Sequence, residues 1–232
     1  MRPDPDKSEP PHHAGHRARL RARFVENGAR ALADYELLEL LLFMAIPRRD
    51  VKPLAKDLLK RFGGIENVFA APTPALCEVE GVSENAAIAI KSVEAAAQRM
   101  MQAGVLDRPV LSSWKRLIDY CHAAMSRESV EQFRVLYLNR KNVLIADEIH
   151  QTGTVDQSAV FPREIAKRAL HHGATALILV HNHPSGDPTP SDADITLTHD
   201  IVRALGPLDI TVHDHLIVAR GGHASLKKLG LL

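Results

Sequence analysis

The stretch from residue 175 to residue 194 restricts the fold of this chain more than any other. Residues 175–180 form an apolar run, which leads directly into two histidines one residue apart, His181 and His183. Prolines and a glycine fill the next loop, and Ser191 and Asp194 then open a segment with a helical pattern. A buried strand, a rigid reversal and a helix N-terminus are therefore expected to follow one another directly.

This spacing suits the coordination of a metal ion. Side chains at positions i and i+2 of a strand point to the same side, so His181 and His183 can present two imidazole nitrogens to one ion. Asp194, in the first turn of the expected helix, can supply a third ligand. Two imidazoles and one carboxylate leave a tetrahedral zinc with one position for water, which is typical of catalytic zinc. The same three ligands could hold another divalent metal.

A structural explanation exists for the last part of the pattern. Ser191-x-x-Asp194 fits a capping box, in which the serine side chain caps a backbone N–H and the acid reaches back to the cap residue. The histidine pair favours a metal site for the whole pattern, because buried strands rarely end in two imidazoles on one face without something to bind. Ser191 can cap the helix while its hydroxyl faces the water on the metal.

A second His-x-His pair, His213 and His215, lies in the strand expected at residues 211–218. No loop and helix with an acid follow it, because Gly221 and Gly222 turn the chain instead. We therefore expect Asp214 and His215 to have a structural role or to support the ligands from behind, rather than to bind the metal.

The sequence His181-x-His183-Pro184, followed by Ser191 and Asp194 at their spacing, resembles the JAMM (MPN+) metalloprotease motif. The longer segments 181–191 and 214–218 look like the bacterial RadC family. The resemblance covers nearly the whole chain and is strongest from about residue 108 onward.

The resemblance implies an α/β fold, in which a small all-α domain precedes a JAMM/MPN domain. The sheet of that domain would be mixed and flanked by helices, similar in architecture to cytidine deaminases. The resemblance also implies one Zn²⁺ per chain, bound by His181, His183 and Asp194. Ser191 would stabilise the oxyanion, and an upstream glutamate would be the general base.

JAMM proteins carry this glutamate just before a hydrophobic strand, and Glu131 precedes the apolar segment 132–138 in the same way. We therefore assign the general base to Glu131. Three other glutamates compete with it: Glu128 lies further from the strand, Glu148 lies in the partner strand, and Glu164 lies in the first turn of a helix, where the helix dipole explains an acid. A solvated charge at the edge of a strand is the alternative explanation for Glu131.

Composition and charge are those of an ordinary globular protein. The 232 residues are 45% hydrophobic and 25% charged, and the formal net charge of +1 gives no overall attraction to nucleic acid or membrane. Residues 37–46 are far too short to span a bilayer, and the sequence has no signal-peptide pattern. Cys77 and Cys121 are isolated, which fits a reducing compartment. We expect a cytoplasmic protein.

Composition and periodicity divide the chain into three regions. Residues 1–28 are rich in Pro, His and Arg and poor in large apolar side chains, so we expect a disordered basic tail. Residues 29–104 read as a helical domain, and residues 105–232 alternate helices with strands, as a mixed sheet requires. The expected strands lie near 134–139, 143–149, 175–180 and 211–218.

Within the helical domain, residues 76–87 resemble a helix-hairpin-helix, whose Gly-hydrophobic-Gly turn offers backbone N–H groups to a DNA phosphate. Here the turn has Gly81, but Ser83 replaces the second glycine, and three nearby glutamates make the turn acidic. A structural or partner-docking hairpin explains the motif at least as well. Weak DNA binding through residues 29–104 and the basic tail is the alternative.

The leading hypothesis is a zinc-dependent metallopeptidase that hydrolyses amide or isopeptide bonds in an unidentified protein or peptide. A rival hypothesis is a DNA-associated accessory protein in repair or recombination with a structural metal, and a third is a catalytically silent JAMM scaffold. The H-x-E and P-C-x-x-C motifs of nucleobase deaminases and the H-E-x-x-H motif of zincins are absent from the sequence.

Overall fold

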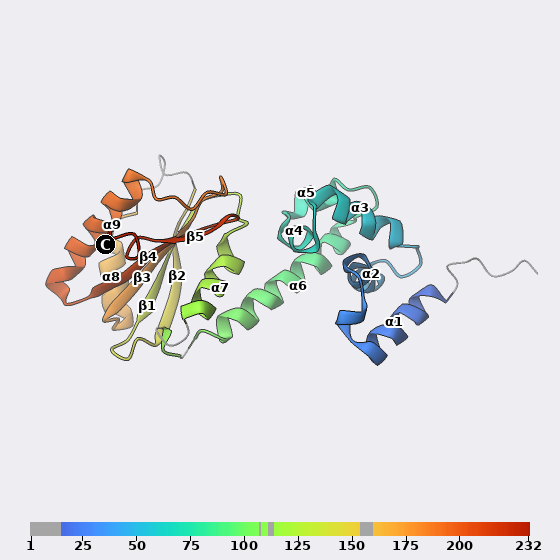
Figure 1. Ribbon diagram of the computed structural model, residues 1–232, viewed down its shortest axis with the longest axis horizontal. Coiled ribbons are helices and arrows are strands. Elements are labelled where there is room, and N and C mark those ends of the chain that lie inside the picture. The colour runs from blue at the N-terminus through green and yellow to red at the C-terminus, as the bar shows by residue number, and fades with distance from the viewer. Residues whose placement is uncertain (1–14, 107, 111–113, 154–159) are drawn as a thin grey trace, which may run out of the picture. The chain divides into compact units, whose positions relative to one another are not determined.

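The computed structural model describes residues 15–106, 108–110, 114–153 and 160–232 (Figure 1). The chain divides into two compact units, one that ends at Ala96 and one that begins at Ala97. This division falls inside a long helix, α6 (Glu84–Ala103), whereas the sequence suggests a boundary after residue 104. Among the described residues, no helix is both long enough and apolar enough to cross a bilayer.

The first unit is built from helices. They are α1 (His16–Asn27), the short 3-10 helix η1 (Ala29–Ala31), α2 (Asp34–Ala45), α3 (Lys52–Phe62), α4 (Ile65–Ala70), α5 (Thr73–Cys77) and the first part of α6. Fully buried leucines of α2 and α3, such as Leu42 and Leu58, form a core with Ile90 of α6. Pro47 follows α2, and Gly63 ends α3 in the left-handed conformation, as their sequence positions suggest.

Helix α1 corrects the prediction of a disordered tail over residues 1–28, which is wrong for His16–Asn27. Leu20 is buried in the core of the first unit. The Arg17 guanidinium donates to the backbone carbonyls of Ile46 (2.6 Å) and Arg49 (2.5 Å) beyond α2. A segment with few apolar residues is thus held by polar contacts that composition does not reveal. Residues 1–14 lie outside the described residues.

The second unit contains one mixed five-stranded sheet in the order β2-β1-β3-β4-β5. Its strands are β1 (Gln132–Leu138), β2 (Leu144–Thr152), β3 (Ala176–Asn182), β4 (Thr211–Ala219) and β5 (Gly222–Ser225). Strands β3 and β4 are parallel, and the other neighbours are antiparallel. This sheet confirms the predicted α/β class and mixed sheet.

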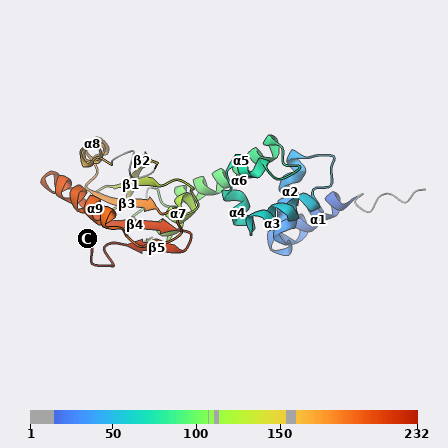
Figure 2. The same cartoon turned by 90° about the horizontal axis from the view of Figure 1, so that it is seen from above.

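Helices cover both faces of the sheet (Figures 1 and 2). The helices of the second unit are α7 (Trp114–Met125), α8 (Pro162–His172), α9 (Asp192–Leu205) and the short 3-10 helix η3 (Gly206–Leu208). One apolar core joins α7 to β3 residues such as Ile178, and the other joins α8 and α9 to Leu177 and Leu179. Alternate residues of β3 therefore enter different cores, as strand geometry requires. The ends of β3 and β4 and the start of β1 meet at one edge of the sheet.

Candidate metal centre

The two histidines of the motif lie at the C-terminal end of β3, the central strand of the sheet. All seven of its residues are buried, so the strand fixes the ligands in the centre of the unit. His181 follows Leu177 and Leu179 on the face that packs against α8 and α9, and its side chain is almost inaccessible to solvent. His183 lies just beyond the strand, and its backbone N–H donates to the carbonyl of Val218 in β4 (2.9 Å).

The loop after His183 is held in place by local contacts. Asp187 Oδ1 accepts hydrogen bonds from the backbone N–H (2.9 Å) and the hydroxyl (2.7 Å) of Thr189, which forms a tight Asx turn. Gly186 has φ of 95°, and its carbonyl accepts from the N–H of Gly221 (3.0 Å) in the turn between β4 and β5. A Cβ atom at Gly221 would lie 2.7 Å from that carbonyl, so only glycine allows this contact.

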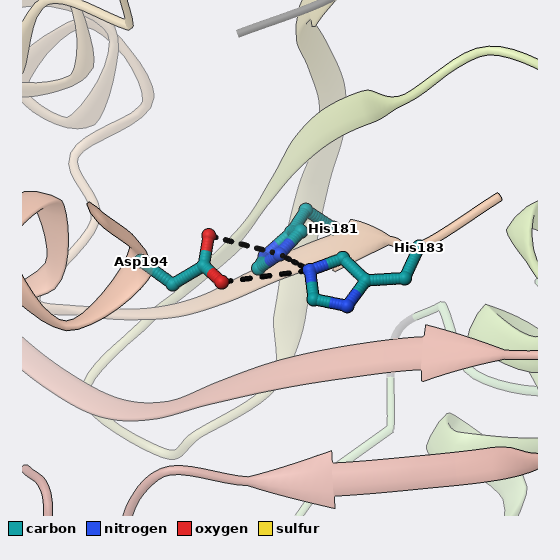
Figure 3. A group of neighbouring side chains, drawn as sticks. All are labelled: His181, His183 and Asp194. Atoms are coloured by element: carbon teal, nitrogen blue, oxygen red, sulfur yellow. Dashed lines mark hydrogen bonds and ion pairs between the residues drawn. The ribbon is translucent and has the colours of Figure 1, made fainter. Parts of the chain in front are cut away.

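Three potential ligands converge where the strand and the loop meet α9 (Figure 3). Nε2 of His181 lies 2.9 Å from Nε2 of His183 and 3.2 Å from Oδ1 of Asp194. Oδ2 of Asp194 lies 3.5 Å from Nε2 of His183. One ligand atom from each residue lies within 4.8 Å of the others, so the structure brings the three predicted metal ligands together.

A chain of hydrogen bonds behind His181 determines which of its nitrogens carries a proton. Thr198 donates its hydroxyl proton to the carbonyl of Asp194 (2.5 Å), so its oxygen can only accept from Nδ1 of His215 (2.6 Å). Nε2 of His215 then accepts from Nδ1 of His181 (2.9 Å). Burial lowers the pKa of His215 well below its usual value and keeps it neutral. Nε2 of His181 is therefore left with a free lone pair.

His183 is held in the same tautomer by the loop. Its Nδ1 donates to the backbone carbonyl of Asp187 (2.9 Å), because a carbonyl can only accept. The lone pairs of two Nε2 atoms thus face each other across 2.9 Å beside a carboxylate. Such an arrangement is repulsive unless a cation lies between the three groups, and it is the donor set that a divalent transition metal requires.

Asp194 is buried and ionised. Burial raises its pKa, but His181, when that ring is protonated, and the hydrogen bonds from Ser191 outweigh this effect and hold the pKa below its usual range. The backbone N–H of Ser191 donates to Oδ2 of Asp194 (2.8 Å). The carboxylate therefore presents its other oxygen, Oδ1, to His181.

Ser191 forms the predicted capping box at the start of α9. Its hydroxyl accepts from the N–H of Asp194 (3.2 Å) and donates to Oδ2 of the same residue (2.7 Å). In this arrangement the serine orients a candidate metal ligand. Its predicted contact with an oxyanion stays a prediction.

Glu131 lies at the same edge, directly before β1. Its carbonyl accepts from the N–H of Gly153 (2.9 Å), so the pairing of β1 with β2 continues to this residue. Phe133 lies opposite His181 in the register and stacks on its ring (centroids 6.3 Å apart), and an antiparallel register continued by two residues would put Glu131 opposite His183. The Glu131 carboxylate makes no ion pair or hydrogen bond with the described residues, including the three candidate ligands.

The competing glutamates are less suited to act as a base. Glu148 forms an ion pair with Arg168 and accepts a hydrogen bond from His172 (2.8 Å). The bond to Arg168, against the opposing effect of burial, lowers the pKa of Glu148 to about 2. Glu164 is exposed on α8 and pairs with Arg163 and Lys167, and Glu128 is exposed before β1.

Two polar residues of the site were missed by the sequence analysis. Asn182, between the two histidines, accepts from the N–H of Gln132 (2.8 Å) and donates to the carbonyl of Val130 (3.1 Å), so it ties the start of β1 to the end of β3. Thr198 supports His215, and its position four residues after Asp194 on α9 was the available signal. The expected supporting role of His215 is confirmed by its contact with His181.

Asp214 has a different role. It accepts hydrogen bonds from the Ser225 hydroxyl (2.6 Å) and from the N–H of Lys227 (3.1 Å), and so fixes the turn after β5.

Comparison with protein families agrees with this geometry. A model of the RadC-like JAB domain matches residues 111–231, which is more than half of the chain. The chain belongs to the RadC family. A model described as UPF0758 N-terminal matches residues 12–88, which correspond to the helical unit that precedes the RadC-like JAB domain. The His181, His183 and Asp194 cluster therefore lies within the part of the chain that defines its membership of the RadC family.

Proposed function

We propose that this RadC family member is a zinc-dependent hydrolase of amide or isopeptide bonds in a protein or peptide. The observation that carries the proposal is the convergence of two unprotonated Nε2 atoms and one ionised carboxylate. These donors fit Zn²⁺, which prefers imidazole nitrogen and carboxylate oxygen, and one ion per chain would be held by His181, His183 and Asp194. When bound, zinc supplies Lewis acidity to polarise an amide carbonyl and to lower the pKa of water.

The residues around the ligands have separate roles in this proposal. Glu131 takes a proton from the attacking water at its carboxylate and passes it to the nitrogen of the leaving amine. Its free carboxylate and its place opposite His183 in the continued register support this assignment. The backbone N–H of Ser191 holds Asp194 in position, and its hydroxyl turns from Asp194 to support the developing negative charge on the carbonyl oxygen of the substrate.

The test of this proposal separates binding from chemistry. Glu131→Gln keeps the size of the side chain but removes the base, so cleavage of quenched-fluorescence peptides should fall by about 10²–10⁴-fold while zinc content is unchanged. Glu128→Gln, at an exposed residue just before β1, is the matched control and should cleave as the wild type does. Loss of zinc in Glu131→Gln, or full activity in that variant, would contradict the assignment.

A second candidate function is DNA binding by the helical unit, supported by one face of α3. Lys52, Lys56 and Lys60 recur every four residues, and the ammonium groups of Lys52 and Lys56 lie 5.5 and 5.1 Å from the centre of the Tyr35 ring. The turn between α5 and α6 is less favourable, because the Arg49 side chain fills the space beside Gly81.

Salt dependence tests this second function. If Lys56 and Lys60 each neutralise one phosphate, Lys56→Ala/Lys60→Ala should reduce the slope of log K against log salt by about 1.8 on duplex DNA. The control is Arg163→Ala/Lys167→Ala on α8 in the second unit, where both side chains are exposed. Equal slopes for the two variants and the wild type would exclude α3 as the contact surface.

A further inference from the structure

A groove in the second unit lies apart from the candidate metal centre. It runs between α7 and β5 and has a volume of about 620 Å³. An adjoining hollow of about 340 Å³ shares Trp114 and Lys228 with it, and we call the two together the α7 groove. These volumes fall in the range of small-molecule sites. Because α7 packs on the sheet face opposite to α8 and α9, the α7 groove and His181 are on different faces.

The apolar part of the α7 groove has an aromatic centre. Trp114 is the single tryptophan of the chain, and it packs with Ile118 against the core while part of its surface stays accessible. Its indole N–H has no hydrogen-bond partner among the described residues, as the contacts of α7 show. A planar ring with a free N–H offers both a stacking surface and a donor.

The polar part of the α7 groove carries more positive than negative charge, because three lysines and two aspartates line it. Lys227 and Lys228 line it, and neither forms an ion pair with a carboxylate of the described residues. Lys115 is neutralised by Asp119 (2.9 Å), and the Asp214 carboxylate is bound by Ser225 and by backbone N–H groups.

The positive charge in this groove affects the pKa of His213. Burial, and then the charge of Lys227, lowers the pKa of His213. Nε2 of His213 contacts Oδ1 of Asn142 at 2.6 Å, so this ring is already held in place beside the lysine.

We propose that the α7 groove binds a nucleoside monophosphate, with its base stacked on Trp114 and its phosphate between Lys227 and Lys228. A phosphate monoester carries a charge of about −1.5 to −2 near neutral pH, so it can pair with the ammonium groups of Lys227 and Lys228. Stacking on an aromatic side chain is available to every base and is tolerant of sequence. An acidic peptide would pair with the lysines, whereas a nucleotide adds stacking of its base on the accessible part of the Trp114 ring. The volume of the groove suits one nucleotide rather than a strand.

The single tryptophan gives a direct assay. AMP added to the full chain should quench Trp114 fluorescence along a saturable curve, equally in chelator-treated and zinc-replete protein, because the site does not involve the metal ligands. Adenosine, which lacks the phosphate, should bind at least about tenfold more weakly. Inorganic phosphate should produce no quenching, because it lacks the base.

Variants and isothermal calorimetry complete the test. Lys227→Ala/Lys228→Ala should weaken AMP binding at least about tenfold, whereas Arg163→Ala/Lys167→Ala on the opposite face should bind as the wild type does. Trp114→Ala should bind AMP no better than it binds phosphate, and circular dichroism checks that each variant is folded.

Several results would overturn the proposal. One is the absence of saturable binding up to about 10 mM AMP, which is tenfold above a weak Kd of about 1 mM. The others are equal affinity for AMP and phosphate, equal affinity for AMP and adenosine, and unchanged AMP affinity in the lysine variant. Binding of an eight-residue oligodeoxyadenylate more than about tenfold tighter than AMP would assign the groove to a nucleic acid strand instead.

Discussion

Replacing Thr198 by valine tests whether the hydrogen bonds behind His181 prepare it for a metal. The substitution keeps the size of a fully buried side chain and removes only the hydroxyl, which bonds the Asp194 carbonyl (2.5 Å) and Nδ1 of His215 (2.6 Å). It leaves the buried Nδ1–H of His215 unsatisfied, whereas the Asp194 carbonyl keeps the helical N–H of residue 198, so the free energy of unfolding of the metal-free protein should fall by about 1–3 kcal/mol. Because a domain has about 5–15 kcal/mol of stability, the variant should still fold.

Zinc affinity is the more specific measure of the same change. Without the hydroxyl, the His215 ring can rotate or change tautomer, and Nδ1 of His181 loses a fixed acceptor. Groups that orient a ligand in this way commonly contribute 10–100-fold to metal affinity, so competition with a chromogenic chelator should show a loss of about that size.

Thr196→Val is the matched control for both measurements. Thr196 lies on the same helix, and its exposed hydroxyl bonds only the carbonyl of Asp192 (2.8 Å), so the control should cost less than about 0.5 kcal/mol and leave zinc affinity unchanged. A Thr198→Val variant with wild-type zinc affinity would refute the argument that the hydrogen-bond chain fixes the tautomer of His181.

Three further outcomes are expected away from the ligands. The ion pair with Arg168 holds the pKa of Glu148 at about 2 instead of 4.5, so its contribution to stability is complete above about pH 4.5 and is lost as the pH falls toward 2; in acid titrations followed by denaturant unfolding, Glu148→Gln should show a smaller loss over this interval than the wild type. Asp147→Ala should destabilise the protein by about 3–5 kcal/mol in urea unfolding, since it leaves the largely buried Arg134 without its carboxylate (2.8 Å), and a cost below about 1 kcal/mol would contradict this. Burial raises the pKa of Cys121 to about 12, so a thiol reagent at pH 8 should label one cysteine in the native protein, the exposed one, and both after denaturation.

The main elements of the fold could be predicted because their sequence signals are local. The predicted bounds of β3, β4, α3 and α8 are close to those observed. They follow from apolar runs, from the alternation of apolar and polar residues, and from the glycines and prolines that end each segment. The short edge strand β5 was missed because Gly222 and its neighbours read as a turn. Its partner is Leu216–Ala219 of β4, and four residues are too few to show a period.

Helix α1 was missed for a different reason. Its composition is unfavourable for burial, and its order depends on contacts with α2 that are more than twenty residues away, such as the hydrogen bond from His16 to Glu39 (2.7 Å). A composition argument treats the segment as if it were alone. Distant polar partners of this kind are decided by the tertiary fold.

Part of the candidate site could likewise be predicted from the sequence, and part of it could not. The three ligands and the serine could be found because strand and helix geometry convert their spacing into a common position. The contacts of Thr198 with His215, and of Asn182 with the start of β1, join segments that only the sheet order brings together. Glu131 was assigned as the general base from the family resemblance. The register of β1 with β3, continued by two residues, supports that choice, but the Glu131 carboxylate makes no hydrogen bond or ion pair with the candidate ligands.

Metal content of the purified protein tests the central claim most directly. Elemental analysis after metal-free handling should find close to one zinc per chain in the wild type and almost none in folded His181→Ala/His183→Ala, because two of the three ligands are removed. A folded wild type that stays free of metal after zinc has been supplied would contradict the proposed metal centre and, with it, the proposed hydrolase.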